Sequence, residues 1–264
     1  MSDYFDNPVV LDRQKVTEVF NDYVKDYDIS NPKIALKVIH TGKVAMLCEE
    51  IALSLGMDEA HVNMAWLIGM LHDIGRFEQL RRYNTFSDAV SIDHALLGCS
   101  ILFEEGRIRD FIKDDSFDGL IHAAIANHSA YRISEELNET EKVYAHILRD
   151  ADKIDIFRVQ IDTPLEEIYD VTTYELKNSV VSEKVMESFF EEHATLRSLK
   201  QTAIDYVVGH ISLAFELVYD KSREITVKQG YLDKLMNFES ENEETKKQLE
   251  QVRNYMNGWL LKAR

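Results

Sequence analysis

The sequence predicts an all-α fold, and three observations lead to this prediction. The chain has 264 residues, of which 45% are hydrophobic and 29% are charged, as in folded globular proteins. It contains only 3 Pro and 10 Gly, so few positions interrupt helices or turn hairpins. Apolar residues recur at helical spacing along most of the chain. We therefore expect a helical bundle with a helical C-terminal extension.

The first strong helix signal begins at Pro32, a residue suited to the first helical turn. The run over residues 34–56 then reads as one amphipathic helix that ends at a glycine. At about 100° per residue, His40 shares a stripe with Val44 and Leu47. His40 is therefore expected to face the core.

A second helix is expected to begin after Asp58, whose side chain is a good N-cap, and to run through Gly75. Its segment AWLIGML is apolar on all sides, which indicates central burial. The helix would deliver His72 and Asp73 from the interior.

Two further helices present a histidine on an apolar stripe. Ser87 or Asp88 is expected to open a helix that carries His94 and closes at Gly106. The next helix starts near residue 117 and carries His128 on its apolar side.

The helix predicted over residues 141–159 carries a carboxylate on its apolar stripe. Asp152 lies in line with Leu148 and Ile156, where an unpaired charge would cost several kcal/mol. Asp150 lies roughly opposite and is expected to be solvated. Asp152 therefore needs a partner.

A change in composition near residue 160 predicts two domains, a core over 1–160 and an acidic helical subdomain over 161–264. Carboxylates far outnumber lysines up to residue 192, and we expect a solvated surface there. A cap over the site and a dimer contact are the alternatives. Helices are expected over 198–220 and 242–264, with a short hairpin or a loop over 223–232.

Charge and composition exclude several classes of function. The formal net charge of −17 repels phosphate backbones, so a nucleic-acid polymer is not an expected partner. Cys48 and Cys99 lie in apolar segments and are expected to be packing residues. No apolar run is long enough for a membrane span and no signal peptide is evident, so the expected location is the cytoplasm.

The polar residues predicted to face the interior form a set of metal-ligand type. Imidazoles and carboxylates suit divalent ions such as Fe, Mn, Zn, Co, Ni or Mg, and helices packed around one centre bring distant ligands together. Neighbouring residues on a helix diverge by about 100°, so an ion between His72 and Asp73 would be held from two directions. The predicted ligands are His40, His72, Asp73, His94, His128 and Asp152.

These residues stand in a pattern that resembles the HD superfamily of metal-dependent phosphohydrolases. The pattern runs from His40 through GMLHDIGR at 69–76 to DADKID at 150–155. The resemblance covers roughly residues 34–160. HALLG at 94–98 and AIANH at 124–128 look like the two additional histidine stations of binuclear members. The HHE triplet and the GYP signature of the HD-GYP subgroup are missing after His128, so cyclic-di-GMP is not expected as the substrate.

The resemblance implies ligands for a first ion at His40, His72, Asp73 and Asp152, and a second ion near the additional histidines. One or two ions per chain are therefore expected. Metal ions of this kind activate water and clamp phosphoryl oxygens. Asp73 would bridge the ions and orient the nucleophile.

Several basic and aromatic residues are candidates for substrate contacts. Arg76 stands one helical turn beyond Asp73 and is expected to bind a phosphate group. Tyr131, Arg149 and Lys153 are further candidates. His122 is either a supporting ligand or a surface residue.

The expected function is hydrolysis of a small phosphorylated metabolite, with a nucleotide-like phosphoester as the favoured substrate. Two alternatives remain open. Some binuclear HD proteins with a similar ligand set activate oxygen at two irons. A non-catalytic module that senses a nucleotide or recruits a partner is the other alternative, and a homodimer is compatible with each.

Overall fold

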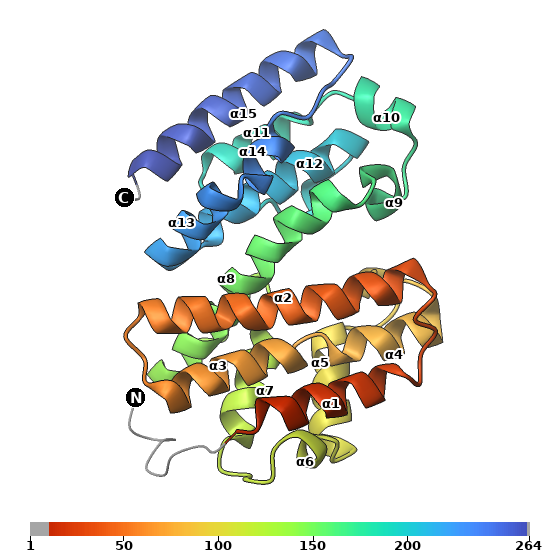
Figure 1. Cartoon of the computed structure of the whole chain (residues 1–264). Coiled ribbons are helices and arrows are strands. Elements are labelled where there is room, and N and C mark those ends of the chain that lie inside the picture. Colours follow the sequence, from red (N-terminus) through yellow and green to blue (C-terminus); the bar gives the residue numbers. More distant parts are fainter. Residues whose placement is uncertain (1–10, 263–264) are drawn as a thin grey trace. The chain divides into compact units, whose positions relative to one another are not determined.

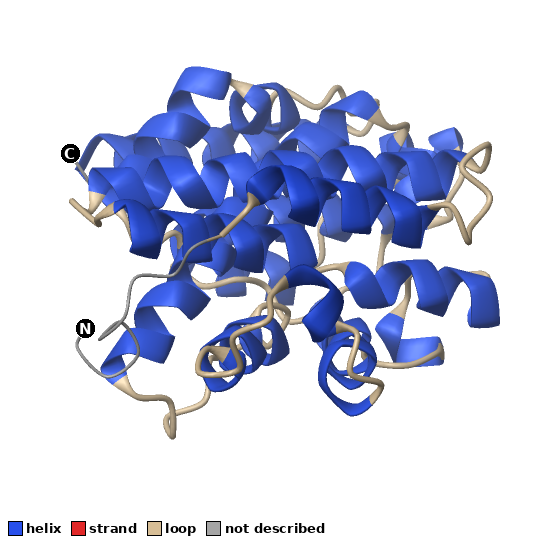
Figure 2. Cartoon of the chain, turned by 60° about the horizontal axis from the view of Figure 1, so that its bottom comes forward, coloured by secondary structure: helices blue, strands red, loops and turns tan. Residues whose placement is uncertain are grey.

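A computed structural model describes residues 11–262 of the chain, and this part contains helices but no strand (Figures 1 and 2). The all-α prediction is therefore confirmed. The chain divides into two compact units, the first ending at Asp152 and the second beginning at Lys153. This division falls within helix α8 (Glu139–Asp162), which also contains residue 160, the boundary expected from composition.

Within the described residues, no helix combines the length and the apolar character that crossing a membrane would require.

The first unit consists of helices joined by short loops (Figure 1). Besides the first part of α8, its elements are α1 (Arg13–Val24), α2 (Pro32–Ser54), α3 (Glu59–Leu71), α4 (Ile74–Tyr83), η1 (Asp88–Val90), α5 (His94–Cys99), η2 (Ser100–Glu104), α6 (Ile108–Phe111) and α7 (Asp118–Asn127).

Helices α2 and α3 lie side by side in the first unit (Figure 1). Asn31 caps α2 through a hydrogen bond from the Lys33 amide, and Asp58 caps α3 through one from the His61 amide, as predicted for Asp58. A Cβ atom at Gly69 would lie 2.6 Å from the Ala45 Cα, so only glycine allows this approach. The close packing brings the end of α3 to the face of α2 that carries His40.

Gly75 has the same role between α4 and α5. A Cβ atom there would collide with the carbonyl oxygen of His94, and it would lie 2.6 Å from the amide nitrogen of Gly98. The two glycines on either side of the His72–Asp73 pair therefore let α2 and α5 approach that pair from different sides.

The start of the helix that carries His94 differs from the prediction. We expected Ser87 or Asp88 to open it, but α5 begins at His94 and its N-cap is Asp93, which accepts hydrogen bonds from the amides of Ala95 and Leu96. The Asp88 carboxylate instead accepts hydrogen bonds from side chains of α4 and α5. Several Asp and Ser residues precede His94, and helix propensity alone does not select the cap among them.

The second unit continues α8 and packs around an apolar core. Its elements are α9 (Leu165–Tyr169), α10 (Thr173–Asn178), α11 (Glu183–Phe190), η3 (Arg197–Leu199), α12 (Ala203–Ile211), η4 (Ser212–Glu216), α13 (Asp220–Gln229), α14 (Tyr231–Met236) and α15 (Glu243–Lys262).

The prediction of a hairpin or loop over residues 223–232 is wrong. Helix α13 ends at Gln229, and Gly230 adopts φ 71°, the left-handed conformation that ends helices, before α14 begins. Ile225 and Leu232 are buried, so both short helices place apolar residues in a core. The β-branched run ITV favours a strand by local propensity, and packing in the folded unit outweighs that preference.

Candidate metal centre

The prediction of one helix through Gly75 is wrong, because α3 ends at Leu71 and His72 and Asp73 lie at the break before α4. His72 follows the last residue of α3, and Asp73 has φ −104° and ψ 16°, outside the helical range, before α4 begins at Ile74. The Asp73 side chain does not cap α4. It is buried in the first unit, where its carboxylate has polar neighbours on both oxygens. The positive end of the α4 dipole stabilises this negative charge.

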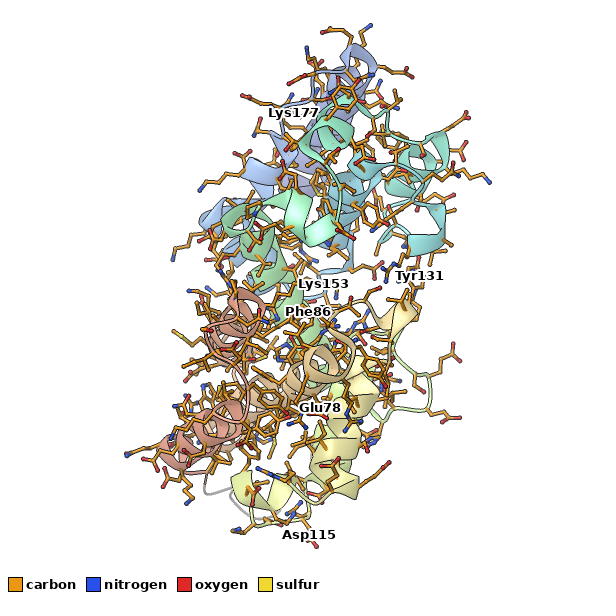
Figure 3. All side chains as sticks on the ribbon, turned by 90° about the vertical axis from the view of Figure 1, so that its right-hand side faces the viewer. Glu78, Phe86, Asp115, Tyr131, Lys153 and Lys177 are labelled. Atoms are coloured by element: carbon orange, nitrogen blue, oxygen red, sulfur yellow. The ribbon has the colours of Figure 1, made fainter. Side chains whose placement is uncertain are left out.

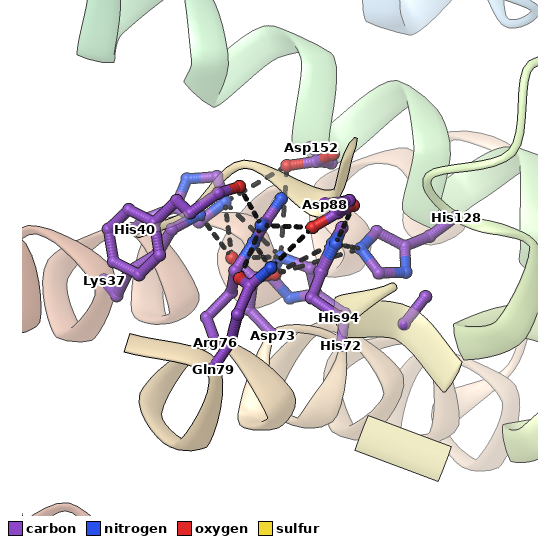
Figure 4. A network of polar contacts seen from close by, with 12 residues as sticks. Lys37, His40, His72, Asp73, Arg76, Gln79, Asp88, His94, His128 and Asp152 are labelled. Atoms are coloured by element: carbon purple, nitrogen blue, oxygen red, sulfur yellow. Dashed lines mark hydrogen bonds and ion pairs between the residues drawn. The ribbon is translucent and has the colours of Figure 1, made fainter. Parts of the chain in front are cut away.

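One oxygen of Asp73 faces a first group of side chains. The Nε2 atoms of His40 and His72 each lie 3.5 Å from Asp73 Oδ2 and 3.3 Å from one another. Asp152 Oδ1 lies 3.1 Å from His40 Nε2 and 3.9 Å from His72 Nε2. The structure thus brings together the four residues that the sequence predicts for a first ion (Figure 4).

The other oxygen of Asp73 faces a second group. Asp73 Oδ1 lies 3.5 Å from His94 Nε2 and 3.9 Å from His128 Nε2. These two nitrogen atoms are 2.9 Å apart. Both histidines are buried, and their rings meet edge to face. The five other predicted ligands are therefore grouped around the Asp73 carboxylate (Figure 4).

Hydrogen bonds at Nδ1 fix the orientation of three of these imidazoles. His72 Nδ1 lies 2.8 Å from the Gly69 carbonyl oxygen, and His128 Nδ1 lies 2.7 Å from the Ile125 carbonyl oxygen. A carbonyl oxygen only accepts, so each Nδ1 carries the donated proton. His94 Nδ1 lies 2.7 Å from the Asp88 carboxylate. When neutral, all three rings therefore direct the Nε2 lone pair at the centre.

The contact between His94 and His128 indicates that the centre needs a cation. With Nδ1 donating in both rings, two neutral imidazoles would face each other with unprotonated Nε2 atoms at 2.9 Å. Two lone pairs repel at this distance, so a proton or a metal ion must lie between them. Nitrogen and carboxylate oxygen donors in this number are those that divalent transition metals prefer. The residues therefore fit a metal centre.

The protonation states also fit metal binding. Burial acts to raise the pKa of Asp73, but Lys37 and the neighbouring His and Arg side chains hold it well below its usual range. Burial likewise acts to raise the pKa of Asp152, but a hydrogen bond from His40 outweighs it together with the nearby histidines, so the pKa of Asp152 is lowered. Burial, with the nearby histidines, lowers the pKa of His128 to about 3. Ionised carboxylates and neutral imidazoles are the forms that bind metal ions.

Two cations stand beside Asp73. Lys37 Nζ lies 2.6 Å from Asp73 Oδ2, and Arg76 Nε lies 3.6 Å from Asp73 Oδ1. Both cations also lie over the ring of Phe86, at 5.5 Å and 5.7 Å from its centroid. Lys37 is not among the site residues predicted from the sequence. The available signal was its spacing, because a residue three positions before His40 lies on the same face of the helix.

A loop after α4 is held over this region by side chains of α4. Arg76 Nη1 donates hydrogen bonds to the Phe86 carbonyl oxygen at 2.6 Å and to Asp88 Oδ1 at 2.9 Å. Gln79 Nε2 lies 2.8 Å from the same Asp88 oxygen and 2.9 Å from the Ile92 carbonyl oxygen. Gln79 is not among the residues predicted from the sequence, because a buried glutamine in a helix carries no pattern of its own.

The remaining candidates for substrate contacts differ in their burial. Arg149 is buried and donates to backbone carbonyls that include those of Asn127 and His128, so it holds the end of α7. Tyr131 is 43% exposed and lies on the loop after α7 (Figure 3). Lys153 is buried. Substrate contacts by Tyr131, Arg149 and Lys153 stay predictions. His122 is exposed, with its ring against Phe103.

The prediction that Asp150 is solvated is wrong. The residue is 0% exposed. The prediction assumed that one face of the helix meets water. Instead Tyr144, Ile147 and Ala151 are buried as well, so this part of α8 is enclosed on several sides.

Comparison with known proteins adds one finding. A family model described as HD domain matches residues 38–156, a range that contains all six residues of the centre. Neither a curated protein nor a solved structure is detectably similar to the chain.

Proposed function

Because residues 38–156 match the HD domain, we propose that this chain is a metal-dependent phosphohydrolase acting on a small phosphorylated metabolite. The HD domain by itself indicates metal-dependent hydrolysis in general. The finer assignment, a phosphoester and in particular a nucleotide-like one, is our proposal.

One observation carries this proposal. The two oxygens of Asp73 face different histidine pairs, His40 with His72 at Oδ2 and His94 with His128 at Oδ1. A carboxylate with nitrogen donors beside each oxygen has the ligands of a bridged pair of sites. Asp152 adds an oxygen donor to the first pair.

The chemistry follows from the donor set. Divalent ions held by such residues activate water as a nucleophile and neutralise the charge of a phosphoryl group. His40, His72, Asp73 and Asp152 would hold one ion, and Asp73, His94 and His128 the other. Asp73 belongs to both sets and would orient the reacting groups between them.

Lys37 and Arg76 would supply the charge that binds substrate. They reach Asp73 from α2 and α4, and the Lys37 side chain is 17% exposed. We propose that both bind phosphoryl oxygens, Arg76 through its planar guanidinium group and Lys37 as a point charge. The excess of negative charge elsewhere on the chain favours a compact substrate over a polyanionic polymer.

The test uses the full chain with Mn²⁺, Fe²⁺, Co²⁺, Ni²⁺, Zn²⁺ or Mg²⁺ and a panel of aryl phosphates, sugar phosphates and nucleoside phosphates. We expect metal-dependent release of phosphate or nucleoside from at least one class. Asp73→Asn should abolish turnover and metal retention. Asp115→Asn, at an exposed position on the loop before α7, makes the same charge change and should leave both unaffected (Figure 3).

Two outcomes would contradict the proposal. Metal-loaded protein that binds a nucleotide but releases no product across the panel would favour a sensing module. Iron-loaded protein that consumes oxygen without releasing phosphate would favour an oxygenase.

A further inference from the structure

Asp88 contacts the centre through His94, and not through Asp73. Its Oδ2 atom lies 2.7 Å from His94 Nδ1, on the side of the ring away from the centre. Its Oδ1 atom accepts hydrogen bonds from Arg76 at 2.9 Å and from Gln79 at 2.8 Å. One oxygen is thus bound by α4 while the other is directed at a predicted ligand.

The three imidazoles with defined Nδ1 partners differ in how that partner is supplied. His72 and His128 donate to backbone carbonyl oxygens three residues earlier in the chain. These hydrogen bonds form whenever the local helix forms. His94 is the first residue of α5 and has no preceding turn of that helix to supply a carbonyl. A side chain from the preceding loop takes that place.

We propose that Asp88 is a positioning residue, which fixes the tautomer and direction of His94 so that Nε2 is available to the second ion. A hydrogen bond from the far nitrogen of a ligand histidine to a carboxylate selects the tautomer that binds metal. Arg76 and Gln79 hold Asp88 in place, and so they connect α4 to the same ligand. This inference rests on the proposed metal centre.

The isosteric substitution Asp88→Asn separates positioning from support of the loop. Arg76 and Gln79 are donors, so the carbonyl oxygen of the introduced amide should take the place of Oδ1 and keep the loop anchored. The NH2 group of that amide then faces His94 Nδ1. It can donate there only if the ring proton moves to Nε2, and a protonated Nε2 cannot bind a metal ion.

The experiment compares wild type, Asp88→Asn, Asp88→Ala and Asp93→Asn. Two-dimensional NMR of ¹⁵N-labelled imidazoles in metal-free protein should show the Nδ1–H form of His94 in wild type and the Nε2–H form in Asp88→Asn. Calorimetric titration with Co²⁺ should give two ions per wild-type chain. In Asp88→Asn the second ion should bind about 10–100-fold more weakly, with the first unchanged.

The remaining variants separate positioning from loop anchoring and from a general effect of charge. If Asp88 only anchored the loop, Asp88→Asn would keep the second ion and only Asp88→Ala would lose it. We instead expect Asp88→Asn to unfold within about 4 °C of wild type and still to lose the second ion. Asp93→Asn makes the same charge change one residue before His94 and keeps a good N-cap, so it should bind both ions.

Three results would overturn the proposal. They are an unchanged His94 tautomer in Asp88→Asn, a single ion in wild type, and loss of the second ion in Asp93→Asn, which would mean that Asp88 and Asp93 hold an ion themselves. None of these readouts requires turnover, so a wild-type chain without hydrolase activity would contradict the proposed function and leave this inference standing.

Discussion

The two compact units are both helical, yet their interiors are filled differently. The core of the second unit consists of apolar side chains from most of its helices, including Phe189, Val208 and Val252. The interior of the first unit contains an apolar shell, in which residues 64–71 of α3 are all buried, around four imidazoles and two carboxylates. An apolar core needs no further component, whereas the polar centre leaves nitrogen lone pairs directed at one another.

A helical unit can support such a polar centre only if the cost of burying its polar groups is offset. Burial of unpaired polar groups opposes folding by several kcal/mol per charge. In the first unit this cost is offset by hydrogen bonds at the far nitrogens of the histidines and by charge pairing of Asp73 with Lys37. We therefore expect substitutions of residues in the polar centre of the first unit to change metal content, and substitutions in the core of the second unit to change stability alone.

The largest effect is expected from removing single ligands of the centre. His40→Ala should release one ion and His94→Ala the other, because they face different oxygens of Asp73. Each should reduce phosphoester turnover by at least about 100-fold, since loss of a ligand exceeds the 10–100-fold effect of losing its hydrogen-bond partner. Metal analysis with assays on the same samples tests this. Loss of both ions from either variant would contradict separate sites.

The corresponding substitution in the second unit is Phe189→Ala. Phe189 is fully buried against Phe190, Phe215 and Tyr255. Truncation should lower the free energy of unfolding by about 3–5 kcal/mol, as for other buried phenylalanines. Urea denaturation followed by circular dichroism measures this. The metal content of the folded fraction should equal that of wild type, and a reduced content would show that the two interiors are not independent.

Removal of metal should destabilise the first unit. An ion present at 100 times its dissociation constant stabilises the folded state by about 2.7 kcal/mol. Chelation should therefore increase hydrogen exchange in α2 and α5, which carry His40 and His94, and leave exchange in α12 unchanged. Equal increases in both units would mean that they unfold as one.

The smallest expected effect is the pH dependence of stability that arises from His210 in the second unit. Burial, with the charge of Lys200, lowers the pKa of His210 to about 3. The unfolded chain binds this proton near pH 6.5 and the folded chain does not, so stability falls as pH falls from about 6.5 towards 3. We expect His210 to account for a loss on the order of 1–2 kcal/mol between pH 7 and pH 5. His210→Gln should lose less stability over that range in denaturant titrations; an equal loss would refute the prediction.

Local patterns were sufficient to predict the starts of α2 and α3, but not the break at His72–Asp73, because one helix was expected to continue through Gly75. Pro32 and Asp58 mark helix starts in the structure as in the sequence, and AWLIGML is buried as its uniform apolarity predicts. The same reasoning failed for residues 223–232 and for Asp150. In both places packing against distant segments decides the outcome, and periodicity within one helix contains no information about those segments.

In the candidate site, too, some residues were predicted from the sequence and others were not. Residue type and pattern identify six side chains that the structure brings together, and their role as ligands stays a prediction. Gln79 was missed because a buried glutamine in a helix has no distinguishing pattern, and Lys37 was missed although its spacing from His40 places both on one face of the helix. Asp88 was misread as a helix cap because its partner His94 is defined only once α4 and α5 have packed through Gly75.

The repeat of single helices was therefore enough to predict a helical protein and to place six imidazoles and carboxylates on inward faces, although it misplaced Asp150. Packing between helices set which oxygen of Asp73 each histidine faces, which nitrogen carries the proton in His72, His94 and His128, and which cations stand beside the centre. Those features depend on distances between helices, which close contacts such as those at Gly69 and Gly75 set.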